Sequence, residues 1–201
     1  MDMSTGVFGL YDALRAGLFS RRDSLPLAYR ISLAVAAAAL TGIAAQMRLP
    51  LPGTPVPVTG QVFAVLLCGA LLGGGYGALS MAFYLGIGLA GMPWFSGSAG
   101  GAALLGVTGG YLIGFLPAAL FIGLLVERIP TSALRPLLLT LIMLGGVGII
   151  YLCGAIQFAA FTGAGLQQTF SLAVAPFVPW DIMKALLAGL TACALLPRNR
   201  G

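Results

Sequence analysis

Charged residues are absent from two long stretches of this chain. None occurs between Arg48 and Glu127, and none between Arg135 and Asp181. Of the 201 residues, 59% are hydrophobic and only 7% are charged, and the mean hydropathy is +1.02. A soluble domain carries roughly a quarter charged residues, so this composition cannot cover a water-facing surface. The chain is therefore expected to lie in a lipid bilayer, where its length allows about five to seven helices of roughly 20 residues.

The same composition excludes several classes of function. The chain has no histidine, the side chain that most often serves as a general acid–base or a metal ligand. Cys68, Cys153 and Cys193 lie singly in apolar runs, as packing residues do, and form neither a metal motif nor a disulfide framework. The net charge of +5 resides in basic residues beside apolar runs, so membrane topology explains it better than nucleic-acid binding. We expect no enzyme activity, no metal and no cofactor.

Hydrophobic periodicity predicts an all-α, polytopic integral membrane bundle of six transmembrane helices. The predicted helices span residues 28–47, 59–72, 76–89, 110–126, 137–161 and 179–196. The second helix is short for a full span, so it is expected to be tilted or buried among the others. Gly73, Gly74 and Gly75 interrupt the apolar run between the second and third helices.

Residues 1–27 are the most polar stretch and are interpreted as a cytoplasmic N-terminal segment. Val7, Leu10, Tyr11, Leu14 and Leu18 recur at helical spacing, which favours a short helix lying on the membrane surface. The segment does not resemble a signal peptide, because the apolar run that follows is too long and no A-x-A cleavage pattern closes it. Residues 28–197 are then one transmembrane domain.

Basic residues orient the bundle, because cytoplasmic loops carry an excess of lysine and arginine. A cytoplasmic N-terminus and six helices place the loop after the fourth helix and the C-terminus in the cytoplasm as well. Arg48 then flanks an outer loop, and Lys184 lies within the last helix. All other basic residues fall on the inner side: Arg15, Arg21, Arg22, Arg30, Arg128, Arg135, Arg198 and Arg200. Both termini are therefore predicted to be cytoplasmic.

Uncommon polar residues gather at the predicted outer ends of the helices. Asp181 and Lys184 stand three residues apart, so they share one helix face and can pair. Charges inside membrane helices usually face a bundle interior or a watered cavity and serve a site. The alternative is a capping aspartate and a lysine that reaches the lipid headgroups. Further polar groups at this end are Gln46, Arg48, Gln61, Tyr84, Tyr111, Gln157 and Trp180.

Two predicted outer loops are also unusual. Residues 48–59 contain four prolines, which stiffen the segment so that it could lie over a cavity as a lid. Residues 91–109 are rich in glycine, which lets backbone amides approach a ligand and hold a carboxylate. The alternative for the second loop is a flexible connection. Ser98 in this loop has no histidine to act as its base, which argues against a serine protease.

The first predicted helix is dominated by small residues, including Ala34 and Ala38 one turn apart. Such a surface lets another helix approach closely. Two partners remain open at this point, namely another subunit or this protein's own helices.

Four motifs in order along the chain resemble a known family. They are TPVPVTGQ at 54–61, YLGIGLAGMPWF at 84–95, GVTGGYLIGF at 106–115 and DIMK at 181–184. Together they are similar to the biotin-uptake S components, the substrate-binding subunits of energy-coupling-factor transporters. The chain departs from the family at Val107, where a proline is usual, and at Trp94, where a smaller apolar residue is common.

The resemblance implies a six-helix bundle in the bacterial cytoplasmic (inner) membrane that binds biotin near the outer face. It implies a membrane coupling subunit and two cytoplasmic ATPases as partners. By position, Asp181 and Lys184 would hold the polar ring of biotin, and the pocket would be lined by Gln61 and the loop residues Phe95, Ser96, Gly100 and Gly101. Ala34 and Ala38 match the small-residue face that S components present to the coupling subunit.

The chemistry of the residues agrees with this expectation. A carboxylate accepts from the N–H groups of a ureido ring, and an ammonium donates to its carbonyl. Tyr84, Phe95 and Tyr111 are expected to enclose the apolar part of biotin. Loop amides, Ser96, Ser98 and Arg48 remain alternatives for its carboxylate.

Two other classes of function compete with a carrier subunit. The chain contains no Walker motif, so ATP-driven work would come from partners. An autonomous biotin or small-vitamin transporter is the alternative, although one Asp/Lys pair is little for a proton relay. A membrane enzyme is disfavoured by the missing histidine and the lack of clustered carboxylates.

Overall fold

The computed structural model describes residues 26–96, 100–130 and 132–196. Apart from Pro26 and Leu27, the predicted N-terminal segment lies outside the described residues. The elements are α2 (Leu27–Gln46), β1 (Arg48–Leu49), β2 (Val58–Thr59), α3 (Gln61–Leu89), α4 (Gly100–Leu105), α5 (Gly109–Val126), α6 (Arg135–Thr162), α7 (Leu166–Ala173), the 3₁₀ helix η2 (Ala175–Phe177) and α8 (Val178–Leu195). The predicted helical bundle is confirmed.

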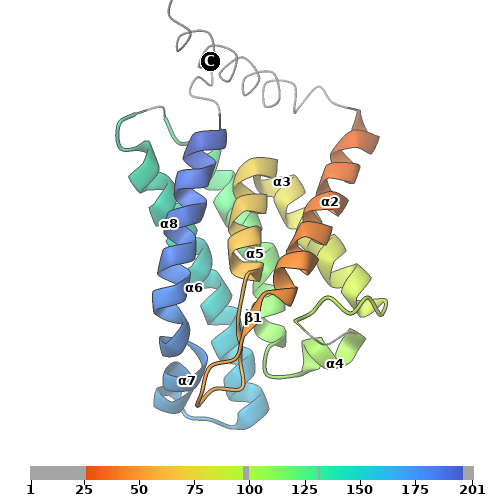
Figure 1. Ribbon diagram of the computed structural model, residues 1–201, viewed down its shortest axis with the longest axis vertical. Coiled ribbons are helices and arrows are strands. Elements are labelled where there is room, and N and C mark those ends of the chain that lie inside the picture. The colour runs from red at the N-terminus through yellow and green to blue at the C-terminus, as the bar shows by residue number, and fades with distance from the viewer. Residues whose placement is uncertain (1–25, 97–99, 131, 197–201) are drawn as a thin grey trace, which may run out of the picture.

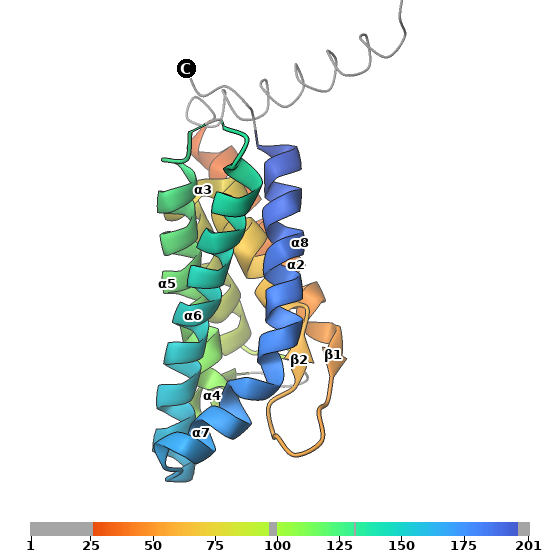
Figure 2. The same cartoon turned by 90° about the vertical axis from the view of Figure 1, so that its left-hand side faces the viewer.

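The long helices pack side by side, and the short elements cluster at one end (Figure 1). The β1–β2 hairpin, α4 and α7 lie at this end, called here the hairpin end. The start of α2 and the end of α8 are both at the opposite end, as the turned view also shows (Figure 2). Which end faces the cytoplasm stays a prediction from the basic residues.

α3 is a helical hairpin whose arms meet at Gly73. This residue has φ 79° and ψ 172°, a conformation that glycine adopts without a steric penalty. The arms then run antiparallel, since a Cβ on Gly77 would stand 2.9 Å from the Cα of Gly69. At their far ends, Gln61 Nε2 donates to the Tyr84 hydroxyl over 2.6 Å. The predicted glycine break between the second and third helices is thus a tight reversal of the chain.

Five helical stretches of the described chain are long and apolar enough to cross a membrane, with α3 counted once and α7 to α8 taken together. Large apolar side chains cover the outside of the bundle, including Leu152 and Ile156, which are 63% and 62% exposed. An apolar exterior of this extent fits lipid and not water. The prediction of six spans treats the arms of α3 separately, and the number of crossings remains a prediction.

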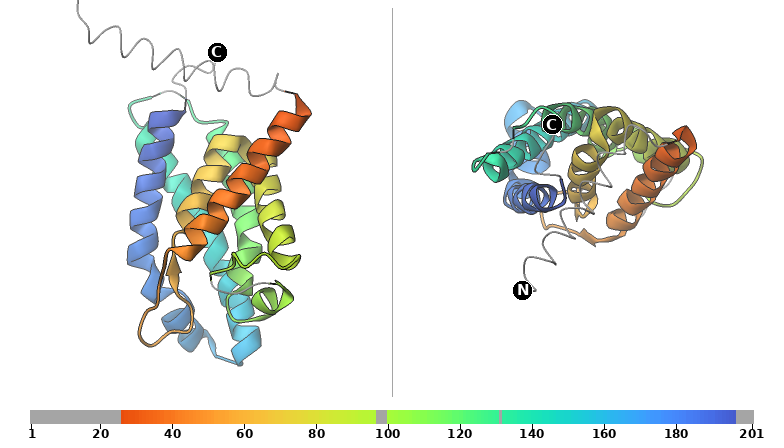
Figure 3. Two further views of the ribbon diagram at one scale, coloured as in Figure 1. Left: turned by 45° about the vertical axis from the view of Figure 1, so that its right-hand side comes forward. Right: turned by 90° about the horizontal axis from the view of Figure 1, so that it is seen from above.

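α2 is a peripheral helix. It leans against α3 at the edge of the bundle (Figure 3). Only 22% of the residues in its most apolar stretch are buried. Ala34 and Ala38 lie on its inner side, where both are 0% exposed. The small residues therefore pack against this protein's own helices in the structure, and their predicted role in docking a partner is untested.

Two short helices, α4 and α7, were not predicted from the sequence. α4 lies in the glycine-rich stretch 91–109 that was predicted as a loop, and α7 lies between the fifth and the last predicted helix. Glycine disfavours an isolated helix, so neither segment signals one locally. Long-range contacts support α4, because Gln157 Nε2 donates to the Leu104 carbonyl in its last turn at 2.5 Å and to the Gly106 carbonyl just after it at 2.8 Å. Packing and capping by a distant side chain thus override the local preference.

Candidate functional site

A cavity of about 490 Å³ opens at the hairpin end between the β1–β2 hairpin and the ends of α3, α5, α6 and α8. Its size falls within the range of about 300–1,000 Å³ for small-molecule sites. The lining residues are Arg48, Pro50, Thr54, Pro55, Val56, Pro57, Val58, Thr59, Gln61, Val62, Phe95, Ser96, Thr108, Tyr111, Leu112, Phe115, Ile150, Tyr151, Phe177, Asp181 and Lys184.

One end of the cavity holds a hydrogen-bonded group of three side chains. Lys184 Nζ lies 2.7 Å from Asp181 Oδ1, and the Tyr151 hydroxyl donates to Asp181 Oδ2 over 2.7 Å. The Lys184 and Asp181 side chains are 12% and 5% exposed. Each carboxylate oxygen retains a free lone pair, and the ammonium retains further N–H donors. The group therefore offers acceptors and donors to a polar ligand.

Local sequence explains the position of Asp181. α8 begins at Val178 with Pro179 in its first turn, where proline fits because the amide it lacks has no partner within the helix. Asp181 follows in the same first turn, where the helix dipole favours a negative charge. Lys184 then lies on the same face one turn later. The first turn of α8 thus holds the carboxylate at the cavity wall.

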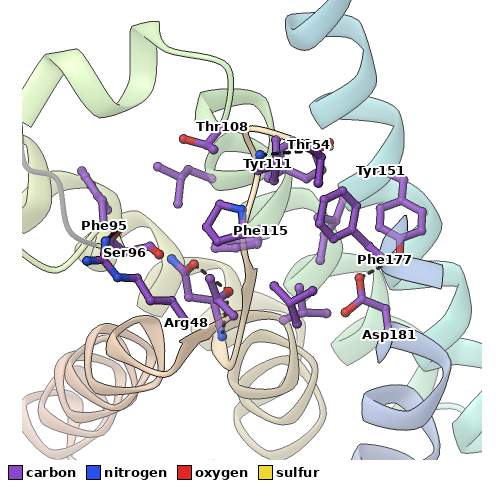
Figure 4. Close-up of a pocket in the computed structure, with 18 of the residues that line it drawn as sticks. Arg48, Thr54, Phe95, Ser96, Thr108, Tyr111, Phe115, Tyr151, Phe177 and Asp181 are labelled. Carbon is purple, nitrogen blue, oxygen red and sulfur yellow. Dashed lines mark hydrogen bonds between the residues drawn. The ribbon is translucent and has the colours of Figure 1, made fainter. Parts of the chain in front are cut away.

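The opposite end of the cavity carries a positive charge. Figure 4 shows Arg48, Phe95 and Ser96 on one side and Tyr151, Phe177 and Asp181 on the other. Arg48 Nη1 donates to the Ser96 carbonyl over 3.0 Å. The Ser96 hydroxyl is buried without a hydrogen-bond partner. This end therefore offers a guanidinium and an unused hydroxyl.

Apolar and aromatic side chains lie between the polar ends (Figure 4). Phe115 and Tyr111 project from α5, and Ile150 projects from α6. The Tyr111 hydroxyl donates to the Ala173 carbonyl at 2.5 Å, so its polar atom is satisfied outside the cavity and its ring can contact a ligand. The middle of the cavity suits a hydrocarbon segment.

The hairpin covers the cavity. Thr54 Oγ1 donates to the Leu172 carbonyl over 2.7 Å, and Val56 and Val58 pack in a cluster with Phe158 and Phe177. The segment predicted as a lid thus forms one wall of the cavity in this structure and is tied to α7 through Leu172.

A hydrogen-bonded chain runs behind the cavity wall from Gln61. Its amide donates to the Tyr84 hydroxyl at 2.6 Å, and that hydroxyl donates to the Trp94 carbonyl at 2.9 Å. The Trp94 indole returns a bond to the Tyr84 carbonyl over 3.0 Å. Tyr84 is 0% exposed and lies outside the lining. Its place in the fold is to fix Gln61 and the backbone that precedes Phe95.

The structure brings most of the predicted site residues to one cavity. Those that line it are Asp181, Lys184, Gln61, Phe95, Ser96 and Tyr111. Gly100 and Gly101 begin α4 and are not among the lining residues. Ser98 lies outside the described residues.

Tyr151 was missed by the sequence analysis, although it contacts Asp181 directly. It stands in the apolar run of α6 with its hydroxyl on a buried carboxylate. A phenol within a membrane helix needs a hydrogen-bond partner. That requirement could have identified Tyr151 as a candidate site residue. The partner is 30 positions away in sequence, so no local pattern identifies it.

The described residues contain no group of three or more His, Cys, Asp or Glu that could hold a metal ion.

The fold and the cavity together define a class of protein. It is a multi-pass helical membrane protein with a site for a small, elongated, partly polar molecule.

The sequence matches the BioY family over residues 18–200, and the chain belongs to this family. A relative from Pyrococcus horikoshii, named "Probable biotin transporter BioY", is 40% identical over 166 residues, covering 82% of this chain and 94% of the relative. The "Biotin transporter BioY" of Thermotoga maritima is 38% identical over 158 residues, covering 78% and 89%.

A solved structure agrees with the sequence comparisons. The crystal structure of the S-component for biotin from an ECF-type ABC transporter superposes with a TM-score of 0.75 at 28% identity, covering 82% of this chain and 89% of that one. The resemblance inferred from the four motifs is confirmed. The names of the relatives describe transport, which confirms the prediction of a transport protein and not an enzyme.

Proposed function

We propose that this chain is the substrate-capture subunit of a biotin-uptake system. It binds biotin in the cavity, with the hairpin end at the outer membrane face, and delivers the vitamin inward together with an energy-coupling module. One observation carries the proposal: the cavity has two polar ends of different chemistry, separated by an apolar middle (Figure 4). The names of the family's characterised relatives support biotin as the ligand.

The ureido ring fits the end that holds Asp181. A ring carbonyl and its neighbouring N–H form an acceptor and a donor side by side. Lys184 Nζ and Asp181 Oδ1 stand 2.7 Å apart, so a donor and an acceptor of the protein face that edge together. Tyr151 holds the second carboxylate oxygen and so fixes the direction of the remaining lone pairs.

The rest of biotin fits the remainder of the cavity. Its thiophane ring and four-carbon chain are apolar and match the surface of Tyr111, Phe115 and Phe95. Gln61 adds one amide at the wall, held in place by Tyr84. We assign Tyr84 a positioning role in this proposal, because its ring is fully buried.

An autonomous transporter is the second candidate. A proton-coupled route needs a series of titratable groups across the membrane. Asp181 and Glu127 are the only carboxylic side chains in the described ranges, and they lie at the start of α8 and just past the end of α5. This wide spacing favours the capture subunit.

Uptake in a host that cannot make or import biotin distinguishes the two candidates. We expect cells with the chain alone to bind labelled biotin without accumulating it. Cells that also carry a membrane coupling subunit and two ATPases should accumulate it, because the module supplies the work. The control is the same module with the Walker lysines replaced. Equal accumulation by the chain alone would establish the autonomous transporter instead.

A further inference from the structure

We propose that Arg48 and Ser96 bind the carboxylate of biotin and thereby select the free acid over its esters and amides. This inference rests on the proposed function and assigns the second end of the same cavity. The sequence alone did not choose among four candidates for binding this carboxylate, namely loop amides, Ser96, Ser98 and Arg48.

Arg48 carries a charge that no described carboxylate balances. The ion pair within the cavity joins Lys184 to Asp181, and Glu127 follows the far end of α5. The contact of Arg48 is a neutral carbonyl, that of Ser96. A guanidinium has five N–H donors, so most of them are available to a ligand. The sequence also predicts all the other arginines on the inner side of the membrane, so the position of Arg48 indicates a role other than topology.

Ser96 contributes a second donor beside the guanidinium. Ser96 is among the residues that line the cavity, and its hydroxyl is buried without a hydrogen-bond partner. A buried hydroxyl without a partner is unfavourable unless a ligand or water satisfies it. The Ser96 backbone has φ 51°, in the left-handed region that non-glycine residues rarely adopt and that often marks ligand-binding segments. Its carbonyl meanwhile holds Arg48 in place.

The placement of the two polar ends on opposite sides of the cavity suits an extended acid. The Arg48 end and the Asp181 end lie on opposite sides of the cavity, with Phe115 between them (Figure 4). A ligand whose polar ring is at Asp181 therefore places the end of its chain at Arg48. A carboxylate accepts two parallel N–H bonds from a guanidinium, and charge-assisted bonds of this kind are roughly twice as strong as neutral ones. An ester or an amide loses that charge.

A binding cycle with biotin and biotin methyl ester tests the inference. In the wild-type protein, biotin should bind roughly 10- to 100-fold more tightly than the ester, the range of a charge-assisted hydrogen bond. Arg48→Gln should weaken biotin binding by about the same factor and change ester binding by less than about 3-fold, so the preference for the acid disappears. Ser96→Ala should weaken biotin binding by about 3- to 10-fold.

Two further variants keep the test decisive. Arg48→Lys retains the charge but not the paired donors, so its affinity for biotin should lie between those of the wild type and Arg48→Gln. Arg128→Gln, beyond the far end of α5, should leave both affinities unchanged. Equal loss of acid and ester binding in Arg48→Gln, or no loss of either, would overturn the assignment while leaving biotin as the ligand. A wild-type protein that binds neither compound would overturn the proposed function and this inference with it.

Discussion

Asp181→Asn should weaken biotin binding on the order of 100-fold or more, since truncating one partner of a buried charged pair has effects of this size. The asparagine side chain replaces one carboxylate oxygen by an N–H₂ donor, which opposes the ureido N–H and removes the acceptor next to Lys184. The change also separates Tyr151 from its ionic partner. Binding of radiolabelled biotin to the purified variant in detergent measures the effect.

A loss of binding must be separated from a loss of folding. Asp181→Asn leaves the Lys184 ammonium, 12% exposed, without its counter-ion, and such a change costs about 3–5 kcal/mol. The double variant Asp181→Asn with Lys184→Gln removes both charges, so it should recover much of the thermal stability. It should not recover binding, because neither ligand-facing charge remains. A stable double variant that binds biotin within about 3-fold of the wild type would refute the role of this pair.

Gly123→Leu should strongly destabilise the bundle. A Cβ on Gly123 would fall on backbone atoms of Gly73 and Gly74, at the reversal of α3. Overpacking typically costs about 1–3 kcal/mol when side chains can move aside. Backbone atoms at a reversal cannot, so we expect the upper end of that range or a failure to fold. The measurement is the midpoint of thermal denaturation in detergent, read as recovery of the folded peak in size-exclusion chromatography.

Gly148→Leu is the matched control for this prediction. Gly148 is exposed on α6, and a Cβ there would meet nothing within 4 Å. Both changes place the same side chain within a long helix, so the intrinsic helix preference is the same in both. Equal midpoints for the two variants would show that the close approach of α5 to the turn of α3 is not important for stability.

The features predicted correctly from the sequence depend on neighbours along the chain. The Asp181–Lys184 pair is separated by three positions, so helical geometry alone brings it together. The break at Gly73 follows from the low helix preference of a glycine triplet. The bundle itself follows from apolar runs that water cannot solvate. In each case the physical cause lies within one or two helical turns.

The features that the sequence did not predict depend on contacts between distant segments. Thr54 reaches Leu172 across 118 positions, and Arg48 reaches Ser96 across 48. α4 and α7 form where tertiary contacts support weak helical segments. Tyr84 was expected at the pocket because it lies near the outer end of a predicted helix and carries an aromatic ring. Position along a helix does not tell whether a side chain faces a cavity, and the structure places this ring behind Gln61. The sequence therefore identified the end of the bundle and the charged pair, but not the complete wall.

The most direct test of the account is an isothermal titration of the purified wild-type protein with biotin in detergent. We predict saturable binding of one biotin per chain, because a single cavity of about 490 Å³ contains both polar ends. Binding should be abolished in the parallel titration of the stable double variant at Asp181 and Lys184. A folded wild-type protein that gives no binding heat, and whose thermal midpoint biotin does not raise, would contradict the assignment of this cavity to biotin.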